Sequence, residues 1–179
     1  MNGFSGGLYG KVYSVYSHFL EGMTKLEALC ETLKNKFKAK TEAKGNVCYI
    51  EVEAEKYLEI AKELHGVFDR LLTVSAVDFI KEGVFEVYFI LYRFDGRIYC
   101  KVSTKIPRDH AEIDSLSGLW PNASMHEREV WEMFGIEFRG NPMLRPLFTE
   151  EWTGPPPFRK DFNWRKYVAE VYHIPQATR

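Results

Sequence analysis

Three apolar segments separated by short turns place the strongest limit on the fold. They are residues 68–80, 84–92 and 98–106. Each is rich in β-branched and aromatic residues, which favour strands. The first turn is Lys81–Gly83, and Asp95-Gly96 is typical of a type I′ hairpin. Parallel strands need crossovers of a dozen or more residues. The pattern therefore predicts an antiparallel meander, with residues 84–92 as its most buried strand.

The residues before the meander predict two helices and one further strand. Thr24, with Glu27 three residues later, forms a capping box for an amphipathic helix that ends near Phe37. Residues 47–52 are predicted as a short strand, and residues 55–65 as a second helix. Helices on one face of a mostly antiparallel sheet make an α+β fold.

After the meander, the sequence changes character. A short helix is predicted over residues 114–120, where Pro121 stops it. Asn122 or Ser124 can cap a second helix, for which Gly135 is a suitable C-terminal cap.

The segment that follows, residues 135–179, is rich in proline and still carries many apolar side chains. Apolar groups on an irregular segment need cover from the domain or from another protein. We expect a flexible extension at residues 1–22, an α+β core with closing helices at 23–134, and an extended partner-binding arm at 135–179. For the extension, a later start at Met23 and a short docking arm are alternatives.

Composition excludes several classes of protein. The chain has 24 Lys and Arg against 25 Asp and Glu, so no broad positive field favours nucleic acid. No run approaches the 18 or so apolar residues of a membrane span, so we expect membrane association only through partners. Cys30, Cys48 and Cys100 are far apart, and four thiolates are usual for an iron–sulfur cluster. We expect them to be reduced, buried thiols.

The predicted helix before Gly135 contains residues that could serve in catalysis or metal binding and one residue typical of an interface. His126 with Glu129 lacks the second histidine of a zinc helix. Glu129, Glu132 and Glu137 are acid–base candidates only if the fold perturbs their pKa values. Trp131 is instead typical of a residue that anchors an interface.

Three blocks of sequence resemble the signature of a known family. They are Glu127–Ile136, Phe138–Arg145 and Pro157–Phe162. In this order they resemble the C-type subunit of respiratory complex I, also called the 30 kDa subunit of NADH dehydrogenase, and its relatives in membrane-bound hydrogenases. The sequence departs from the family pattern at Asn141, where His is usual, and at Met143, where Asp is usual. These departures fit a divergent branch, such as an archaeal-type hydrogenase or a related membrane complex.

The resemblance implies a non-catalytic subunit in the hydrophilic arm of a membrane-bound oxidoreductase, on the cytoplasmic side and peripheral to the inner face of the membrane. It implies no redox cofactor in this chain. Iron–sulfur clusters, and nickel–iron in the hydrogenase type, would belong to the partners. The partners implied are a large, hydrogenase-like subunit of the 49 kDa type and a cluster-bearing small subunit, with no nucleic acid.

Ten residues of these blocks are the expected interface or motif residues, and none is expected to be catalytic or metal-binding. Most are expected to organise the corner between core and arm: Glu127, Arg128, Glu129, Trp131, Phe134, Gly135 and Arg145. The others are expected to fix the arm to a partner: Arg159, Lys160 and Asp161. The alternatives are a freestanding binding module of the same fold and an acid–base enzyme that uses Glu129 and His126.

Overall fold

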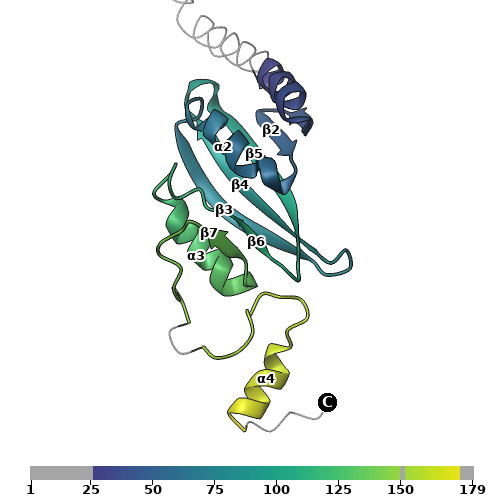
Figure 1. The fold of residues 1–179 in the computed structure, drawn as a ribbon, viewed down its shortest axis with the longest axis vertical. Helices are drawn as coiled ribbons and strands as arrows, with labels where there is room; N and C mark the ends of the chain where they lie inside the picture. The colour runs from purple at the N-terminus through teal and green to yellow at the C-terminus, as the bar shows by residue number, and fades with distance from the viewer. Residues whose placement is uncertain (1–25, 150–151, 174–179) are drawn as a thin grey trace, which may run out of the picture. The chain divides into compact units, whose positions relative to one another are not determined.

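The computed structural model describes residues 26–149 and 152–173 of the chain. A five-stranded sheet has the strand order β1-β2-β5-β4-β3, and a smaller sheet pairs β6 with β7 (Figure 1). The strands are β1 Lys40–Lys44, β2 Val47–Glu51, β3 Arg70–Phe79, β4 Val84–Arg93, β5 Ile98–Pro107, β6 Glu112–Asp114 and β7 Glu137–Arg139. The helices are α2 Tyr57–His65, α3 Ala123–Phe134 and α4 Trp164–Val171, with the 3-10 turns η1 Ala54–Lys56 and η2 Asp95–Arg97, and residues 26–37 are also helical.

The meander β3–β5 confirms the strongest sequence prediction. Short turns join its strands, which makes neighbouring strands antiparallel. Phe85, Val87, Phe89 and Leu91 alternate along β4 and are fully buried, so β4 is the most buried strand, as predicted. The predicted two-residue hairpin at Asp95-Gly96 is wrong in detail. The turn is a 3-10 segment over Asp95–Arg97, in which the left-handed φ angles fall on Gly96 and Arg97.

The other edge of the sheet contains a hairpin that the sequence analysis missed. Residues 40–44, for which the sequence analysis predicted no strand, form β1 and pair antiparallel with β2. Gly45, at φ 61°, makes the turn between them. The β2 strand then pairs parallel with β5, with Cys48 opposite Cys100. The long connection through α2 and the meander makes this parallel pairing possible.

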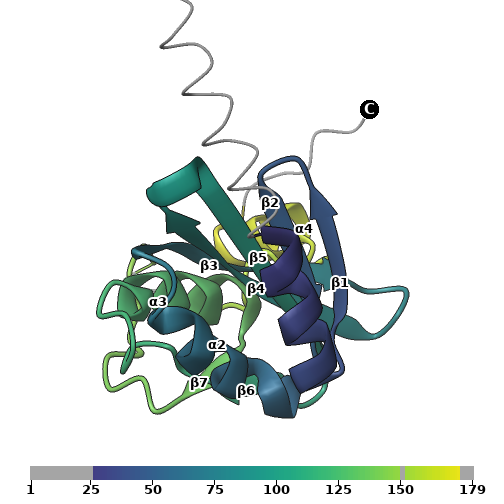
Figure 2. The ribbon, with the colours of Figure 1, turned by 90° about the horizontal axis from the view of Figure 1, so that it is seen from above.

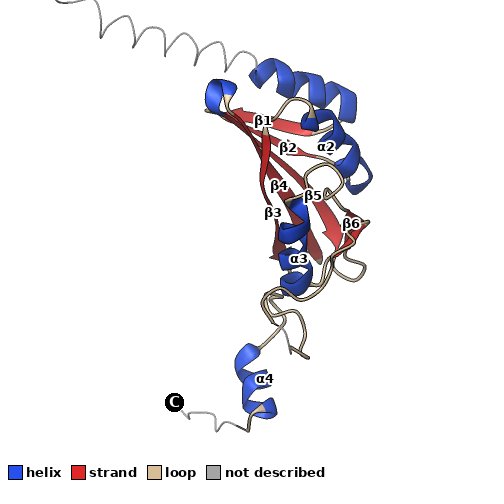
Figure 3. Ribbon diagram, turned by 90° about the vertical axis from the view of Figure 1, so that its left-hand side faces the viewer, coloured by secondary structure: helices blue, strands red, loops and turns tan. Residues whose placement is uncertain are grey.

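The described chain divides into two compact units. One comprises the residues up to Leu72 together with Phe89–Thr104, and the other comprises Thr73–Tyr88 and the residues from Lys105 onward. In the first unit, the helix of residues 26–37 and α2 lie side by side on one face of the strands (Figures 2 and 3). The Tyr57 ring of α2 packs edge-on against Phe89 of β4, with ring centroids 5.3 Å apart.

A disulfide in this unit contradicts the prediction of three reduced thiols. Cys30, on the helix of residues 26–37, is bonded to Cys48 of β2, and their Cα atoms are 6.5 Å apart. The fold causes the pairing, because it brings together two cysteines that are 18 residues apart in the sequence. Cys100 remains a free, buried thiol, as expected. The predicted cap at Thr24 and the extension at residues 1–22 lie outside the described residues.

The second unit holds the predicted interface helix. It is α3, which begins at Ala123 and ends at Phe134, where Gly135, the predicted C-terminal cap, has a φ of 74°. The helix predicted over residues 114–120 is wrong. Residues 112–114 form β6, which pairs parallel with β7, and residues 117–119 form a turn. Ser115 and Leu116, which should have begun that helix, instead donate hydrogen bonds to a glutamate of α3.

The segment expected to be an extended arm is extended only in part. It begins with β7, and its described residues also include α4. Asn163 caps α4 by accepting a hydrogen bond from the backbone N–H of Lys166 at 3.1 Å. Within residues 26–149 and 152–173, no helix combines the length and the apolar character needed to span a bilayer.

Candidate functional site

Two charged residues of α3 hold the loop that follows β7 by its backbone. Arg128 donates hydrogen bonds from Nε to the carbonyl oxygen of Arg145 at 3.2 Å and from Nη2 to that of Pro146 at 3.0 Å. Glu132, one helical turn later, accepts hydrogen bonds from the backbone N–H groups of residues 147, 148 and 149, the shortest of them at 2.6 Å. The Thr149 hydroxyl also bonds to Glu132. We call this arrangement the loop clamp, since it satisfies both donors and acceptors of an irregular backbone.

The loop clamp keeps the Glu132 carboxylate charged. Burial favours the neutral acid and raises its pKa, but the hydrogen bonds from Thr149 and from the backbone of residues 147–149 outweigh burial, so the pKa is lowered. A carboxylate with several N–H donors is an effective anchor, because each bond to a charged group is stronger than a neutral one. Glu132 therefore fixes the course of the loop.

Glu127, the residue directly before Arg128, is fully buried. Its Oε1 accepts a hydrogen bond from the backbone N–H of Leu116 at 2.6 Å. Its Oε2 accepts from the Ser115 hydroxyl at 2.6 Å and from the Asn141 side-chain amide at 2.9 Å. The pKa of Glu127 is raised because its burial outweighs these bonds. Asn141 stands where the family pattern has His, and here it donates to a motif glutamate.

A buried aspartate on β3 ties down the segment that follows the proline run. Asp78 is only 2% exposed and accepts a hydrogen bond from the backbone N–H of Lys160 at 2.9 Å. Arg108 lies beside Asp78, with Nη2 donating to Oδ2 at 3.0 Å and Nε 2.9 Å from Oδ1. The same guanidinium donates to Asp161 at 2.8 Å. We call these four residues the arm anchor.

Two charges of the arm anchor stabilise one another. Burial would raise the pKa of Asp161, but the hydrogen bond and charge of Arg108 outweigh it and lower that pKa. For Arg108, burial acts to lower the pKa, and the bonds to Asp161 and Asp78 outweigh it, so its pKa is raised. Arg108 and Asp161 therefore stay ionised near neutral pH, and this part of the arm is fixed to its own chain by charge.

Aromatic stacking extends the arm anchor to the end of α3. Phe134 packs edge-on against Phe85 of β4 and against Phe158 of the arm, with ring centroids 6.1 Å and 5.8 Å apart. The Arg159 guanidinium lies 5.5 Å from the centre of the Phe85 ring. Gly135 is required here for two reasons. Its φ of 74° suits glycine, and a Cβ would come within 2.9 Å of the Pro156 ring.

Further along, the arm builds a small aromatic cluster and leaves three large apolar side chains exposed on and just after α4. Trp152, Phe162 and Tyr167 pack together with ring centroids 4.9–5.8 Å apart. On α4 and just after it, Trp164 is 59% exposed, Val171 48% and Tyr172 66%. These positions differ by seven and eight residues, so they share one side of the helix. We call them the α4 stripe.

The structure places the ten predicted residues in three settings. Glu127, Arg128, Phe134 and Gly135 shape the corner between α3 and the arm, whereas Arg145 takes part through its carbonyl oxygen. Lys160 and Asp161 belong to the arm anchor, and Arg159 lies over Phe85 beside it. Glu129 is exposed and Trp131 is half-buried. The contacts of Arg159, Lys160 and Asp161 are within the chain, and their role toward a partner stays a prediction.

The acid–base and metal readings gain no support from this geometry. Across residues 26–149 and 152–173, no group of three or more His, Cys, Asp or Glu side chains is placed to hold a metal ion. Glu132 was weighed as an acid–base candidate, and both of its carboxylate oxygens are engaged in the loop clamp.

Sequence reasoning missed the two residues that organise the arm anchor. Alternate residues of β3 face the core, and Asp78 falls on the same face as the buried Val74 and Ala76. A charged side chain therefore occupies a core-facing position of the strand. That signal was available, because a buried charge needs a partner. Arg108, 30 residues later, carried no comparable signal.

The comparisons with known proteins agree with this architecture. Residues 50–168 match the family described as the respiratory-chain NADH dehydrogenase 30 Kd subunit. The chain is 34% identical over 148 residues to the C-type subunit of NADH-quinone oxidoreductase from Roseiflexus sp. (strain RS-1), covering 79% of this chain and 84% of that protein. It is 33% identical over 116 residues to the C/D-type subunit of NADH-quinone oxidoreductase from Azotobacter vinelandii (strain DJ / ATCC BAA-1303), covering 64% of this chain but 19% of that longer protein.

A solved structure has the same fold. A chain of the membrane-bound sulfane sulfur reductase, described as an archaeal respiratory membrane complex, superposes with a TM-score of 0.72 at 29% identity. The superposition covers 87% of this chain and 95% of that one. The α+β sheet, the motif glutamates of α3 and the family match lead to one conclusion: the chain belongs to the 30 kDa subunit family of respiratory-chain NADH dehydrogenase and is a subunit of a complex I-like oxidoreductase.

Proposed function

We propose that the chain is a non-catalytic structural subunit that holds the large, hydrogenase-like subunit of its complex through the C-terminal arm. The observation that carries this proposal is the α4 stripe. Its three large apolar side chains are about half exposed or more, on and just after a helix whose Tyr167 packs into an aromatic cluster. Exposed apolar groups gathered on one face mark an interaction site, and Trp and Tyr are frequent binding hot spots.

The nature of the partner is supported by the relative from Azotobacter. The name of that protein combines the C and D types, and this chain matches about a fifth of its length. A single chain that joins C to D brings the two parts together, so a D-type subunit is the natural partner for a separate C-type chain. The partner would offer an apolar groove for the α4 stripe.

The redox cofactors of the complex belong, in this proposal, to the partner subunits. Two of the three cysteines are bonded to each other, which leaves Cys100 as the one free thiol. A cluster usually needs four thiolates. The chain would lie on the cytoplasmic side, peripheral to the inner face of the membrane, and would reach the membrane only through the large and small subunits.

Recovery of partners from native membranes tests the proposal. A tagged full-length chain is purified in mild detergent, and the bound proteins and metals are identified. We expect a hydrogenase-like large subunit to be recovered with the wild type. Trp164→Ala should weaken that association about 30-fold, as for a hot spot worth about 2 kcal/mol. Glu170→Ala, at an exposed position of the same helix, is the matched control.

Two outcomes would contradict the proposal. Recovery of the chain alone from wild-type membranes would favour a freestanding binding module. Equal recovery with Trp164→Ala and Glu170→Ala would show that the α4 stripe is not the contact.

The loop clamp and the arm anchor make a second, indirect contribution in this proposal. Arg128→Ala and Arg159→Ala remove contacts that set the course of the chain after α3. Both variants should lower the yield of assembled complex, because the arm would be presented less often in its bound form. The free subunit should show no change in metal content. Normal assembly of both variants would count against the role of this corner.

A further inference from the structure

The helix of residues 26–37 docks on the first unit through a stripe of buried side chains. Leu26, Leu33 and Phe37 are buried against the unit. The cross-contact to α2 is the ion pair of Lys36 and Glu63, 2.7 Å apart, with both side chains about half exposed. An exposed ion pair of this kind contributes little to stability.

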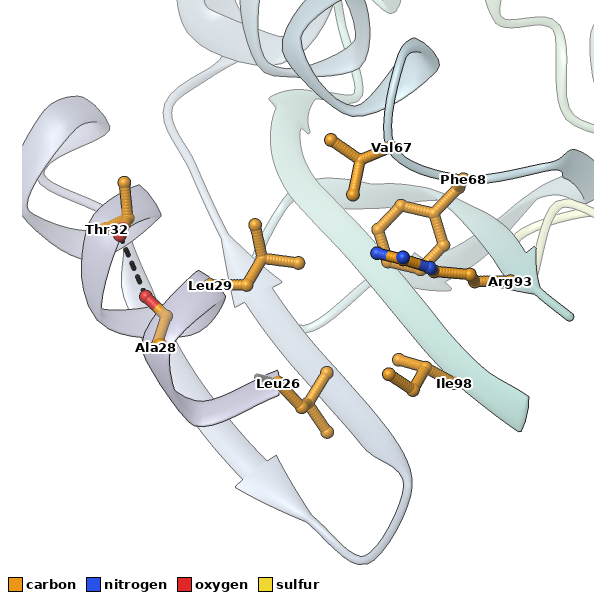
Figure 4. Close-up of a pocket in the computed structure, with 8 residues that line it drawn as sticks. All are labelled: Leu26, Ala28, Leu29, Thr32, Val67, Phe68, Arg93 and Ile98. Carbon is orange, nitrogen blue, oxygen red and sulfur yellow. Dashed lines mark hydrogen bonds between the residues drawn. The ribbon is translucent and has the colours of Figure 1, made fainter. Parts of the chain in front are cut away.

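A pocket of about 280 Å³ lies beside this helix. Leu26, Leu29 and Thr32 line it from the helix, and Phe68 and Ile98 are among the residues that line it from the other side (Figure 4). The Thr32 hydroxyl donates to the carbonyl of Ala28 within the helix. Ala28 and Thr32 are exposed, so the pocket opens to solvent on this side of the helix. The helix therefore docks along one buried stripe, with an open pocket beside it.

The Cys30–Cys48 disulfide adds a covalent link between this helix and the sheet. It joins the helix to the second residue of β2 and so closes a loop that contains the whole of β1. We propose that this disulfide is a covalent latch that keeps the helix of residues 26–37 on the sheet, and that its reduction loosens the helix while the sheet stays folded.

The chemistry of the latch is thiol–disulfide exchange with a disulfide-bearing oxidant. While the helix is undocked and its cysteine is accessible, the Cys30 thiolate attacks the oxidant, forms a mixed disulfide and releases the first thiol. The second thiolate then displaces the remaining half, so that one protein S–S bond forms and the oxidant leaves as two thiols. Because Cys30 and Cys48 are both buried, the completed bond is shielded from attack by reducing thiols in the surroundings.

The third cysteine supplies an internal control. Cys100 is the register partner of Cys48 and is fully buried. Burial raises the pKa of its thiol, so it is held protonated, and the thiolate is the form that attacks a disulfide. Cys100 should therefore stay reduced beside the latch.

The test counts the free thiols of the full chain and then measures how well the helix of residues 26–37 is protected from hydrogen exchange. Free thiols are blocked with N-ethylmaleimide during lysis in denaturant, so that the buried Cys100 is also reached, and the mass and labelled positions of the chain are measured by mass spectrometry. We expect one label, on Cys100, before reduction and three labels after it. Three labels before reduction, or a bond between Cys48 and Cys100, would overturn the proposal.

Hydrogen exchange then tests whether the disulfide keeps the helix of residues 26–37 on the sheet or has no effect on it. Residues 26–37 should exchange about tenfold faster or more in the reduced chain, whereas β4 should keep its protection. Cys30→Ala should behave as the reduced wild type, and Cys100→Ala as the oxidised one. Equal exchange of residues 26–37 in the oxidised and reduced chains would also overturn the proposal.

Discussion

The two units attach their outlying segments to the sheet by different means. The first unit holds the helix of residues 26–37 with a stripe of buried apolar side chains and one disulfide. The second holds the loop at 145–149 and the segment at 158–161 with buried or half-buried charges, in the loop clamp and the arm anchor.

The difference follows from the hydrogen bonds of the backbone. A helix satisfies most of its own N–H and C=O groups, so it needs only an apolar face to dock. An irregular loop cannot, and each unpaired backbone group left near the core costs free energy. Charged side chains such as Glu132 and Asp78 are strong partners for such groups. All four tryptophans belong to the second unit, so tryptophan fluorescence follows that unit selectively.

The largest effect is expected when the loop clamp loses its acceptor. Glu132→Ala leaves three backbone N–H groups and the Thr149 hydroxyl without their partner. The free energy of unfolding should fall by about 3–5 kcal/mol, as for a broken buried charged network. Urea denaturation followed by tryptophan fluorescence measures this. Glu129→Ala, on an exposed face of the same helix, should change stability by no more than about 0.5 kcal/mol. Similar losses in the two variants would contradict the comparison.

An apolar truncation should act on the first unit in the corresponding way. Leu33 is 1% exposed on the helix of residues 26–37. Leu33→Ala should cost about 2–4 kcal/mol through lost burial and a new cavity. Hydrogen exchange should show the loss in residues 26–37 and in the first unit. A loss confined to the second unit would show that the units do not divide as described.

The pH dependence should separate the two buried glutamates of α3. The pKa of Glu132 is lowered from its usual value of 4.5, so its contribution to stability is present above pH 4.5 and is lost as pH falls through its folded-state pKa. The pKa of Glu127 is raised from 4.5, so its contribution is full below pH 4.5 and declines as pH rises toward its folded-state pKa.

Stability curves from pH 3 to 7 test these opposite signs. Glu132→Gln should flatten the loss of stability on the acid side of about pH 4.5, and Glu127→Gln should remove the decline above that pH. Urea midpoints at each pH supply the data. If both variants change the slope of stability against pH in the same direction, the two carboxylates do not have pKa values shifted in opposite directions.

The smallest effect is expected for the ion pair between the two helices of the first unit. Lys36→Ala removes the contact to Glu63, but both side chains are about half exposed. The free energy of unfolding should fall by about 0.5–1 kcal/mol at most, and by less at high salt. Thermal unfolding followed by far-UV circular dichroism at two salt concentrations measures it. A loss comparable to that of Leu33→Ala would mean that charge holds this helix as well.

The parts of the fold that follow from local pattern were the predictable ones. The β-branched and aromatic residues of 84–92 predicted β4, and Gly135 after a predicted helix predicted the end of α3. The β1–β2 hairpin and the parallel β2–β5 pairing were not predictable in this way, because strand pairing depends on residues far apart in sequence. The helix expected at residues 114–120 failed because Ser115 and Leu116 bond to Glu127 instead.

In the candidate site, too, residues with a local sequence signal were predictable and residues paired by distant contacts were not. The motif glutamates, Arg128 and Gly135 could be chosen from sequence because they cluster within one helix and its cap. Asp78 and Arg108 could not be paired from sequence, because each gains its role only when β3, the end of β5 and the arm come together. The disulfide was missed for the same reason, since the spacing of Cys30 and Cys48 carries no motif.

The distance along the chain between Asp78 and Lys160 has a consequence for synthesis on the ribosome. The two residues are 82 positions apart, so Asp78 leaves the ribosome about 4–16 s before the backbone N–H that will bind it, at about 5–20 residues per second. Arg108 follows Asp78 by 30 residues and can neutralise it in the meantime. The nascent sheet can therefore carry its buried charge safely before the arm exists, and closing of the arm over Asp78 would be among the last steps in the maturation of the second unit.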